Sequence, residues 1–461
     1  MNNTCAVILA GGEGTRMKSD KPKVMAELLF KPMLSWVIDA AKGAGINDIL
    51  VVTGYKSEVI AEYLQGTCET AKQEQRLGTG HAVMQAADFI KRHSGGNVLI
   101  LNGDAPLIDS KTISDALTFH TDGNFVQTVI SAKIENPFGY GRIVRTESGD
   151  FSAIVEEASA TDEIKKINEI NSGVMWFNCD TLIELLGKIK NDNSKGEYYL
   201  TDTVEIALSE GKKVGAFITC NCDAVLGANS RVQLYELNEK VRISILEKFM
   251  LEGVSIPCID GVLIDKNTVI GRDTVILPGT IIKEGCIIGS GVTIGPNTVL
   301  YKTTVGNDTV LNSVQAEEAV IGSDVSMGPF VHIRPNSVIK DGAHCGNFVE
   351  VKNSTVGEKT SISHLTYVGD SDVGSGVNIG CGVVTVNFNG KDKNRCKIGD
   401  DAFIGCNTNL IAPVEVGDRA YTAAGSTITE DIPADALAIA RERQTNIDEW
   451  VKIKKPYREK K

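Results

Sequence analysis

The sequence contains no CxxC pair, no long apolar run and no excess of positive charge. Its eleven cysteines follow no regular framework, which indicates reduced thiols in a cytoplasmic protein. No stretch approaches the ~18 apolar residues that a membrane helix needs. The apolar start, Cys5 to Ala10, is too short for a signal core and lacks a basic n-region. The net charge of -12 argues against non-specific binding to nucleic acid or membrane surfaces. We therefore expect a soluble, intracellular protein.

The glycine-rich stretch near the N-terminus lacks the features of two common nucleotide-binding motifs. It runs from Leu9 through Ala10, Gly11 and Gly12 to Met17. Without Gly-Lys-Ser/Thr it is not a Walker A loop, and its spacing does not fit the dinucleotide fingerprint. Glycines alone would also fit a plain turn. Arg16 and Lys23, however, supply cations for a transferring phosphoryl group, and this combination favours a phosphate-binding loop.

The first half of the chain alternates short apolar stretches with amphipathic ones. Ala6–Leu9, Ile49–Thr53 and Val98–Leu101 are strand-like, and 33–44 and 80–93 are helix-like. This alternation predicts an α/β Rossmann-like domain over residues 1–228, with a mostly parallel sheet. Ligands bind beyond the carboxyl ends of such strands. The glycine-rich loop follows Leu9, and Asn102, Gly103 and Asp104 follow Leu101.

A helical period follows at residues 229–252, which we interpret as a linker between two domains. One apolar stripe is formed there at three- and four-residue steps by Leu234, Leu237, Val241, Ile245 and Phe249.

Residues 253–461 contain a repeat of six. Aliphatic residues occupy the first seat of successive hexads, for example Ile276, Ile282, Ile288 and Ile294, and Gly often follows. Such a period is typical of a parallel β-helix. Three hexads make one triangular coil, so residues 262–432 predict about nine coils. The stacked coils form a three-sided column, which we call the prism. A prism of this length exposes flat faces, and we expect a homotrimer to cover them. The basic end, Lys452 to Lys461, is interpreted as a solvated tail.

Two cations and one histidine of the prism stand at positions that do not face its interior. Arg334 and Lys352 each follow a first seat and are 18 residues apart, so they stack one coil apart. Such a pair repels unless an anion lies between, which favours a phosphate site over two surface cations. His364 stands at the third seat of the hexad that starts at Ile362, off the inward position. A lone histidine is often structural, but this imidazole could take a proton from an attacking amine.

The glycine-rich loop and the prism together resemble a known family. The loop is similar to that of sugar-nucleotide pyrophosphorylases. Nearly the whole chain resembles the bifunctional N-acetylglucosamine-1-phosphate uridyltransferase and glucosamine-1-phosphate N-acetyltransferase family. That resemblance implies a left-handed parallel β-helix. It implies two reactions: acetylation of glucosamine 1-phosphate by acetyl-CoA, then transfer of UMP from UTP to N-acetylglucosamine 1-phosphate with release of pyrophosphate. In a bacterium the product would feed cell-wall synthesis.

For the uridyltransferase reaction, the resemblance assigns residues to three groups. Gln73, Gly78 and Thr79 resemble the uracil-binding segment, and Leu9, Ala10, Gly11, Gly12 and Lys23 the triphosphate-binding part. The sugar pocket corresponds to Asn102, Gly103, Asp104, Gly141, Glu156 and Asn171. Asp104 and Asn229 correspond to ligands of Mg²⁺, which prefers hard oxygen donors. From the residues alone, Asn-Gly-Asp also fits a turn, Asn229 a helix N-cap and Glu156 a solvated strand end.

For the acetyltransferase reaction, the resemblance assigns His364 as the general base. It assigns binding of the amino-sugar phosphate to Arg334, Lys352, Tyr367 and Asn378. Acetyl-CoA contacts are implied for Cys381, Asn387, Phe388, Cys406, Ala424 and Arg441, of which Asn387 and Phe388 lie where the hexads are interrupted, between Thr385 and Ile398. The family commonly has Ala, Tyr and Ser where this chain has Cys381, Phe388 and Cys406. We expect altered affinity for acetyl-CoA from these departures, with activity retained.

Two other functions fit parts of the sequence. A monofunctional pyrophosphorylase would use the prism only for assembly or regulation, and a non-enzymatic scaffold would bind a partner through flat faces. The first predicts a short prism without a basic corner or a nearby histidine. This chain has a long prism with both, which favours two active sites.

Overall fold

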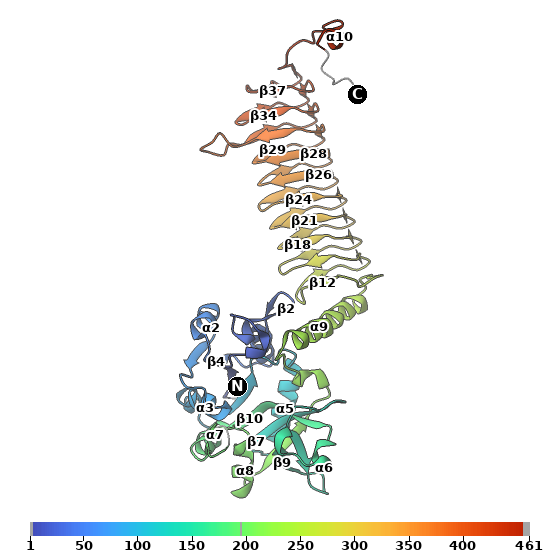
Figure 1. Ribbon diagram of the computed structural model, residues 1–461. Coiled ribbons are helices and arrows are strands. Elements are labelled where there is room, and N and C mark those ends of the chain that lie inside the picture. The colour runs from blue at the N-terminus through green and yellow to red at the C-terminus, as the bar shows by residue number, and fades with distance from the viewer. Residues whose placement is uncertain (1–2, 194–195, 455–461) are drawn as a thin grey trace, which may run out of the picture. The chain divides into compact units, whose positions relative to one another are not determined.

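The computed structural model describes residues 3–193 and 196–454, and Figure 1 shows the arrangement of their elements. The chain divides into two compact units, the first ending at Val241 and the second beginning at Arg242. The division falls inside helix α9, Arg231–Leu251. Part of the predicted basic tail, 455–461, lies outside the described residues.

The first unit is built on one nine-stranded sheet. Its main path runs in the order β11-β7-β10-β6-β1-β4-β5, and β8 and β9 extend from β10. The strands are β1 Thr4–Ala10, β4 Asp48–Thr53, β5 Glu69–Lys72, β6 Asn97–Asn102, β7 Gln127–Lys133, β8 Arg142–Arg145, β9 Phe151–Val155, β10 Glu169–Asn178 and β11 Val214–Ile218. A separate two-stranded sheet joins β2 Glu27–Leu28 to β3 Lys31–Pro32.

The main path of the sheet is mostly parallel, as expected, and β10 is its one antiparallel strand. β1 pairs in parallel with β4 and β6, as the α/β pattern predicted. β10 runs antiparallel to both β6 and β7, and β8 and β9 form a further antiparallel pair. Val174 to Phe177 of β10 are buried. A strand covered on both faces has the same continuous apolar composition whichever way it runs, so composition does not reveal its direction.

Helices cover both faces of this sheet (Figure 1). In β1, Cys5 and Val7 belong to one buried cluster and Ala6 and Ile8 to the other, since successive strand residues point to opposite faces. The helices are α1 Met33–Gly43, α2 Ser57–Leu64, α3 Thr79–Met84, α4 Ala87–Lys91, α5 Ser110–Asp122, α6 Asp162–Lys165, α7 Cys179–Leu186 and α8 Asp202–Ser209, with 3-10 turns η1 Thr15–Met17, η2 Lys23–Met25, η3 Glu157–Ser159 and η4 Cys222–Val225.

Two helical predictions differ in outcome. The segment 80–93 is divided into α3 and α4 by a turn at Gln85 and Ala86. Residues on both sides of that turn are buried against the same cluster, so the apolar pattern of the sequence continues across the turn and does not reveal it. In α9, four of the five stripe residues are buried, and Leu234 is half-buried.

The second unit is a parallel β-helix. An 18-stranded sheet contains two interleaved columns of parallel strands, and a nine-stranded sheet forms the third face. The first column has β12 Leu263–Ile264, β15 Ile281–Ile282, β18 Val299–Tyr301, β21 Val314–Glu317, β24 Val331–Ile333, β31 Val384–Val386, β34 Asn409–Ile411 and β37 Thr427–Ile428. The second has β14 Val275–Ile276, β17 Thr293–Ile294, β20 Val310–Leu311, β23 Ser326–Met327, β30 Asn378–Ile379, β33 Phe403–Ile404, β36 Tyr421–Thr422 and β38 Leu437–Ala438, and both columns share β26 His344–Lys352 and β28 Ser361–Gly369.

The third face has nine strands, one for each of the nine predicted coils. They are β13 Val269–Ile270, β16 Ile287–Ile288, β19 Thr304–Val305, β22 Ala319–Ile321, β25 Ser337–Ile339, β27 Thr355–Val356, β29 Ser371–Val373, β32 Cys396–Ile398 and β35 Val414–Val416. Beyond the prism, a short helix α10 spans Trp450–Lys454.

First-seat residues fill the interior of the prism. Residues such as Ile276, Ile333 and Leu410 are fully buried, whereas Ile270 in the first coil is half-buried. Register between coils joins first seat to first seat, for example Ile379 to Ile404. The hexad prediction is therefore confirmed, because the period places one apolar side chain inside each strand.

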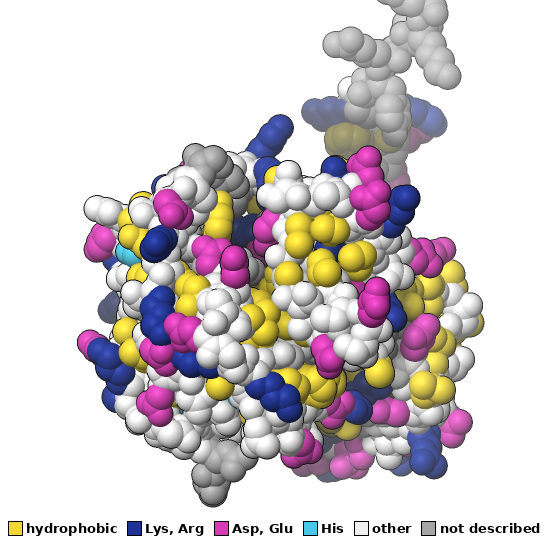
Figure 2. Space-filling view, turned by 90° about the horizontal axis from the view of Figure 1, so that it is seen from below, with side chains coloured by type: hydrophobic (Ala, Val, Ile, Leu, Met, Phe, Trp, Pro, Cys, Tyr) yellow, Lys and Arg dark blue, Asp and Glu magenta, His cyan; other side chains and the backbone are white. Residues whose placement is uncertain are grey.

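Two surface features bear on possible partners. Among the described residues, no helix combines the length and the apolar character that a membrane crossing requires. On the face of the molecule seen in Figure 2, Lys and Arg side chains are interspersed with Asp and Glu.

Two candidate active sites

The glycine-rich loop begins where the central strand β1 ends, at Ala10. Gly14 has φ 66°, and a Cβ added there would lie 2.5 Å from Cβ of Lys23. Both the left-handed backbone and the contact favour glycine. The loop thereby brings Lys23, which begins the 3-10 turn η2, against the end of the sheet.

Lys23 joins the two predicted magnesium ligands. Its ammonium donates hydrogen bonds to the carboxylate of Asp104 and, at 2.9 Å, to Oδ1 of Asn229. The Asp104 and Lys23 side chains are 24% and 13% exposed. These oxygens come from segments 125 residues apart in the chain and converge on one positive charge. Carboxylate and amide oxygens that surround a cation in this way fit the hard-donor preference of Mg²⁺.

A cavity of about 360 Å³ lies along the glycine-rich loop. It collects the residues predicted to bind uracil and triphosphate, which are Leu9, Ala10, Gly11, Gly12, Lys23, Gln73, Gly78 and Thr79, together with Asn102 and Asp104 of the predicted sugar and magnesium sites. Gln73 is 6% exposed, and its Nε2 donates a 3.1 Å hydrogen bond to the carbonyl of Gly78. That bond holds the carboxamide in one orientation, which a polar base-recognition group requires.

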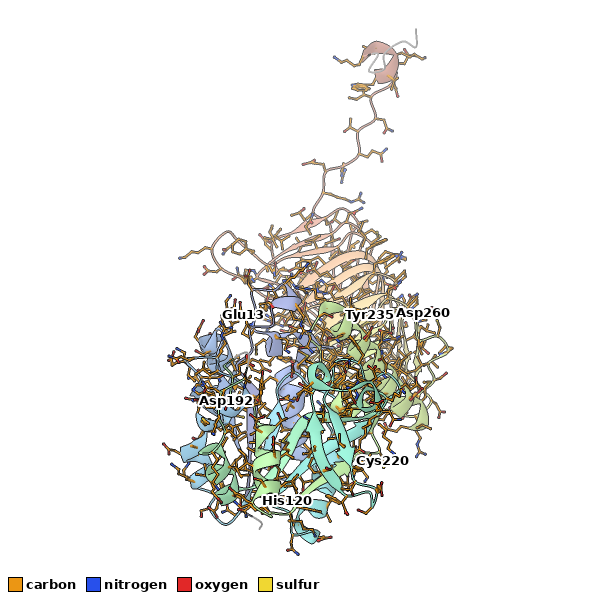
Figure 3. The ribbon with its side chains drawn as sticks, turned by 60° about the horizontal axis from the view of Figure 1, so that its bottom comes forward. Glu13, His120, Asp192, Cys220, Tyr235 and Asp260 are labelled. Atoms are coloured by element: carbon orange, nitrogen blue, oxygen red, sulfur yellow. The ribbon has the colours of Figure 1, made fainter. Side chains whose placement is uncertain are left out.

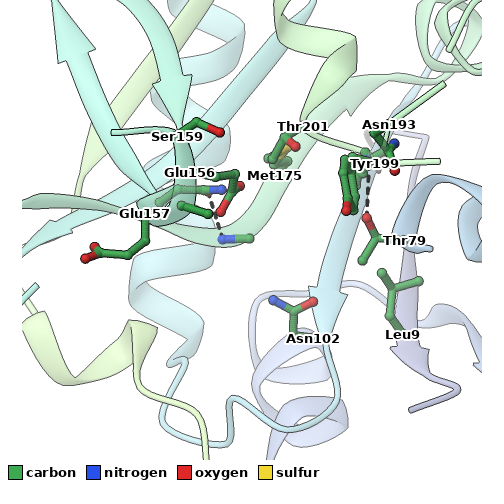
Figure 4. A pocket seen from close by; sticks show the side chains of 14 residues that line it. Leu9, Thr79, Asn102, Glu156, Glu157, Ser159, Met175, Asn193, Tyr199 and Thr201 are labelled. Carbon is green, nitrogen blue, oxygen red and sulfur yellow. Dashed lines mark hydrogen bonds between the residues drawn. The ribbon is translucent and has the colours of Figure 1, made fainter. Parts of the chain in front are cut away.

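A larger cavity of about 580 Å³ adjoins the first, because Leu9, Thr79, Asn102 and Tyr199 line both. Figure 4 shows Glu156 and Asn102 on opposite sides of this hollow. Asn171 also lines it, so three residues of the predicted sugar pocket meet there. The hydroxyl of Thr79 accepts a 3.0 Å hydrogen bond from the backbone of Leu200, which fixes one wall.

Gly103 and Gly141 contribute backbone close to these cavities. The amide of Gly103 donates to the carbonyl of Leu9 at 2.9 Å. A Cβ at Gly141 would lie 3.3 Å from both carboxylate oxygens of Glu156. Both glycines therefore leave room for neighbouring site residues.

Arg16 stands apart from the other predicted residues. It is exposed in η1 and lines neither of these two cavities. The cation found at the cavity wall instead is Arg76, which pairs with Glu13 at 2.6 Å. Tyr199, which lines the larger cavity, was not predicted. It lies in residues 196–199, which have no regular structure, and in the sequence it is marked only as one of two adjacent tyrosines among polar residues.

The basic corner of the prism contains three cations. Ile333 and Val351 are in register, so Arg334 and Lys352 lie on adjacent coils. Arg334 pairs with Glu350 at 3.0 Å, a contact that the prediction of two facing cations did not take into account. The adjacent ammonium of Lys393, together with burial, lowers the pKa of Lys352, and the nearby carboxylate of Asp370 opposes this shift without cancelling it. Neighbouring like charges favour a bound anion.

A buried carboxylate lies beneath this corner. Asp370 is 4% exposed and has φ 48°, and it accepts hydrogen bonds from the side-chain amides of Asn353 and Asn387. Burial raises its pKa, but these two hydrogen bonds and the charges of Lys352 and Lys393 outweigh burial, so the net pKa is lowered. Asp370 therefore stays ionised. Asp370 could not be predicted as a site residue, because Gly-Asp at a coil corner also fits a turn.

Asn387 also connects Asp370 to Tyr367. Its Nδ2 lies 3.3 Å from the hydroxyl of Tyr367. A Cβ at Gly369 would lie 2.3 Å from that hydroxyl, so the ring lies over a residue that must be small. Asn387 begins the predicted interruption, which leaves the prism between β31 and β32 and carries exposed Phe388.

His364 is exposed on β28, one coil above Asn347. Its Nδ1 lies 3.1 Å from Oδ1 of Asn347. Because the amide oxygen only accepts, the ring hydrogen is on Nδ1, and Nε2 carries the lone pair. The arrangement presents an oriented base at the surface.

Three of the remaining predicted residues of the prism share one column with His364. Ile362, Ile379, Ile404 and Thr422 are in register, so the residues two positions later stack in one column. That column contains His364, Cys381, Cys406 and Ala424. Asn378 precedes Ile379 and is half-buried, and Arg441 approaches Gly425, whose added Cβ would be 3.9 Å from its Cδ.

Comparisons with known proteins agree with this division. A family model described as nucleotidyl transferase matches residues 5–222. A model described as bacterial transferase hexapeptide matches 267–302 and 395–430. Curated relatives named bifunctional protein GlmU are similar over nearly the full length. Those of Acetivibrio thermocellus, Clostridium kluyveri and Clostridium novyi are 48%, 47% and 45% identical, covering 98%, 97% and 97% of this chain and 97%, 98% and 98% of the relatives.

Proposed function

This chain belongs to the family of the bifunctional protein GlmU and is a transferase with uridyltransferase and acetyltransferase activities, and we propose how its residues divide between the two reactions. The first unit couples N-acetylglucosamine 1-phosphate to UMP from UTP. The prism acetylates glucosamine 1-phosphate with acetyl-CoA and supplies the acceptor for the first unit. The supporting observation is that each unit has its own cluster of oriented polar side chains.

In the first unit, the smaller cavity takes UTP and the larger one takes the acceptor sugar. Gln73 orients the uracil, and the backbone of the glycine-rich loop approaches the triphosphate. Glu156 and Asn171 hold sugar hydroxyl groups in the larger cavity. The phosphate oxygen of the sugar then attacks the α-phosphorus in line, and pyrophosphate leaves. This reaction needs positioning and charge neutralisation but no covalent intermediate on the protein.

Asp104 and Asn229 would hold the magnesium ion. Their oxygens already face a common cation, the ammonium of Lys23. Among residues 3–193 and 196–454, no group of three or more His, Cys, Asp and Glu side chains is placed to hold a metal. A site with two protein ligands suits Mg²⁺, which keeps water and phosphate oxygens as further ligands. Bound there, Mg²⁺ would neutralise charge on the phosphate oxygens.

In the prism, Lys352, Lys393 and Arg334 hold the phosphate of glucosamine 1-phosphate, with Tyr367 and Asn378 beside it. Nε2 of His364 accepts a proton as the amine nitrogen attacks the thioester carbonyl. The C–S bond then breaks, and the thiolate leaves and takes up a proton. Asn347 keeps the N–H on Nδ1, so that Nε2 is free to accept. Acetyl-CoA extends along Cys381, Cys406 and Ala424, with Arg441 near its phosphates and Phe388 against one side.

The observation that carries this division is that the oriented His364 and the basic corner of Lys352 and Lys393 belong to one unit, which is separate from the glycine-rich loop. The test gives the purified chain glucosamine 1-phosphate and acetyl-CoA and follows free thiol. Release by the wild-type chain, and its loss in His364→Ala with pyrophosphate formation intact, would support two sites. A wild-type chain that releases no thiol would refute the acetyltransferase assignment.

We further propose a homotrimer in the cytoplasm. Along the third face of the prism, Val269, Ile287 and Val320 are 59%, 53% and 48% exposed. These exposed aliphatic residues lie on a flat parallel sheet, with Thr304 between Ile287 and Val320, and favour association with further copies. Light scattering should give a mass about three times the 49.4 kDa of one chain.

A further inference from the structure

One corner of the prism carries a continuous column of third-seat residues. Cys345, Ile362, Ile379, Ile404 and Thr422 are linked coil to coil by strand register. The residues two positions later therefore stack in the same order, and they are Asn347, His364, Cys381, Cys406 and Ala424. Two cysteines are thus direct neighbours in this column.

Side chains of this column reach one another across adjacent coils. Asn347 and His364 demonstrate this, since their side chains lie within 3.1 Å. The chain turns in the same way after each seat: Gly382 and Asn407, which follow Cys381 and Cys406, have φ values of 76° and 55°. The backbone therefore turns in the same sense after both cysteines.

Strand register places the two cysteines on adjacent coils, at a backbone separation that a disulfide can span. The amide of Asn407 donates to the carbonyl of Cys381 at 2.7 Å, so the coils are in direct contact at this seat. Adjacent strands lie ~4.8 Å apart, and disulfides span Cα separations of about 4.4–6.8 Å. Cys406 is exposed, and exposed disulfides are the readily reduced ones.

The thiols also differ in access. Cys406 is exposed and Cys381 half-buried, and both are free. Cys286, Cys345 and Cys396 of the same prism are buried. An exposed thiol beside a partly covered one provides an attacking and a resolving position.

We propose that Cys381 and Cys406 form a reversible dithiol–disulfide switch beside the acetyl-transfer site. The thiolate of Cys406 attacks a low-molecular-weight disulfide RSSR, which forms a mixed disulfide and releases one RS⁻. The thiolate of Cys381 then attacks the Cys406 sulfur, forming the Cys381–Cys406 bond and releasing a second RS⁻. The protein loses two protons and two electrons, and RSSR becomes two RSH. The closed disulfide stops acetyl transfer, a consequence that rests on the proposed function.

The expected inhibition of acetyl transfer follows from the place of the two cysteines in the column. Cys381 is the next member of the column after His364, and Cys406 lies between Cys381 and Ala424. A disulfide would occupy the corner along which acetyl-CoA extends. The first unit contains neither cysteine, so UMP transfer should continue.

The test incubates the full chain with glutathione disulfide. Proteolysis and mass spectrometry then seek a peptide that links Cys381 to Cys406, and thiol release and pyrophosphate release are assayed in parallel. Cys381→Ala and Cys406→Ser are compared with their own untreated activities. Cys220, labelled in Figure 3, is exposed on the first unit, and Cys220→Ser is the matched control.

We expect the linked peptide, loss of at least nine-tenths of acetyl transfer, unchanged UMP transfer and full recovery with dithiothreitol. Under glutathione disulfide, Cys406→Ser should keep the rate it shows before treatment, Cys381→Ala should stop at a mixed disulfide on Cys406 without a linked peptide, and Cys220→Ser should remain sensitive. Modification of Cys220 shows that the reagent has reacted, so absence of the linked peptide in that sample would overturn the proposal. A protein that carries the link but transfers acetyl at an undiminished rate would also overturn it. A chain that forms the link but never transfers acetyl would refute the proposed function and leave the dithiol established.

Discussion

The side-chain amide of Asn387 donates a hydrogen bond to the buried carboxylate of Asp370. Through this contact, a residue of the protruding loop is fixed to the prism beneath the basic corner. The same carboxylate lies in the field of Lys352 and Lys393. Asp370 therefore acts on the acceptor site through other residues, as a positioning residue.

Asp370→Asn should weaken binding of glucosamine 1-phosphate. The amide tolerates the left-handed backbone but removes the charge that Asn387 and the two lysines face. A hydrogen bond to a charged group contributes about 1.5–3 kcal/mol, so kcat/KM for the sugar phosphate should fall about 10- to 100-fold. We expect most of the loss in KM, because His364 is untouched.

Asp372→Asn is the matched control, since Asp372 is exposed and pairs with Arg395 at 2.5 Å. It should leave kcat/KM within about twofold of wild type, as exposed ion pairs contribute little. Equal losses in both variants would contradict a positioning role for Asp370.

His364→Ala should lower the rate of acetyl transfer by about 10²- to 10⁴-fold, the usual contribution of a positioned general base. Asn347→Ala should lower kcat less and leave both KM values unchanged, because it only fixes the tautomer of His364. His344→Ala provides the comparison: it lies on β26 and bonds to the hydroxyl of Ser326. Steady-state assays of thiol release measure all three. If His344→Ala were as impaired as His364→Ala, the base would be misassigned.

Removal of divalent cations should separate the two activities. A chelator should abolish pyrophosphate formation and leave thiol release unchanged, since only the first unit has the converging oxygens of Asp104 and Asn229. Asp104→Asn should raise the Mg²⁺ concentration for half-maximal rate by about tenfold or more. Asp88→Asn, at a side chain that is 98% exposed, should match wild type. A magnesium titration unchanged in Asp104→Asn would remove Asp104 from the metal site.

His120 should make the first unit less stable in acid. It is 2% exposed on α5, and burial lowers its pKa from 6.5 to about 4. Between these values the unfolded chain binds a proton that the folded chain does not, so stability rises with pH there. The contribution is fully present above pH ~6.5 and is lost as pH falls toward ~4, by about 3 kcal/mol in total.

Denaturant titrations followed by tryptophan fluorescence measure this effect, because the fully buried Trp176 reports the first unit. The difference in unfolding free energy between wild type and His120→Gln should be constant above pH ~7 and shift against wild type by about 3 kcal/mol at pH ~4. A difference that does not vary with pH would show that His120 stays neutral in both states.

The prism could be predicted closely because each coil contacts only its neighbours, so the same side-chain pattern repeats along the chain. One inward side chain per strand produces a strict period, and Ile333 and Ile404 are buried as that period requires. The direction of β10 could not be predicted, because a doubly covered strand has no directional signal. The break between α3 and α4 was hidden for a similar reason, since Val83 and Phe89 on either side face the same core.

Site residues were predictable where function needs a local motif, such as the glycine-rich loop with Lys23. They were not predictable where a side chain acts through distant contacts. Asp370 reaches Asn353 and Asn387 only once two coils and the protruding loop are stacked. Lys393 and Tyr199 likewise lie in irregular segments whose partners are far away in sequence.

The central claim, two separable active sites on one chain, is tested most directly by complementation in solution. Asp104→Ala and His364→Ala chains, purified separately, receive glucosamine 1-phosphate, acetyl-CoA, UTP and Mg²⁺, alone and mixed, and UDP-N-acetylglucosamine is quantified. We predict almost no product from either variant alone and a sustained rate from the mixture, because released N-acetylglucosamine 1-phosphate passes from one protein to the other. A mixture that forms no more product than the sum of its two components would contradict the account.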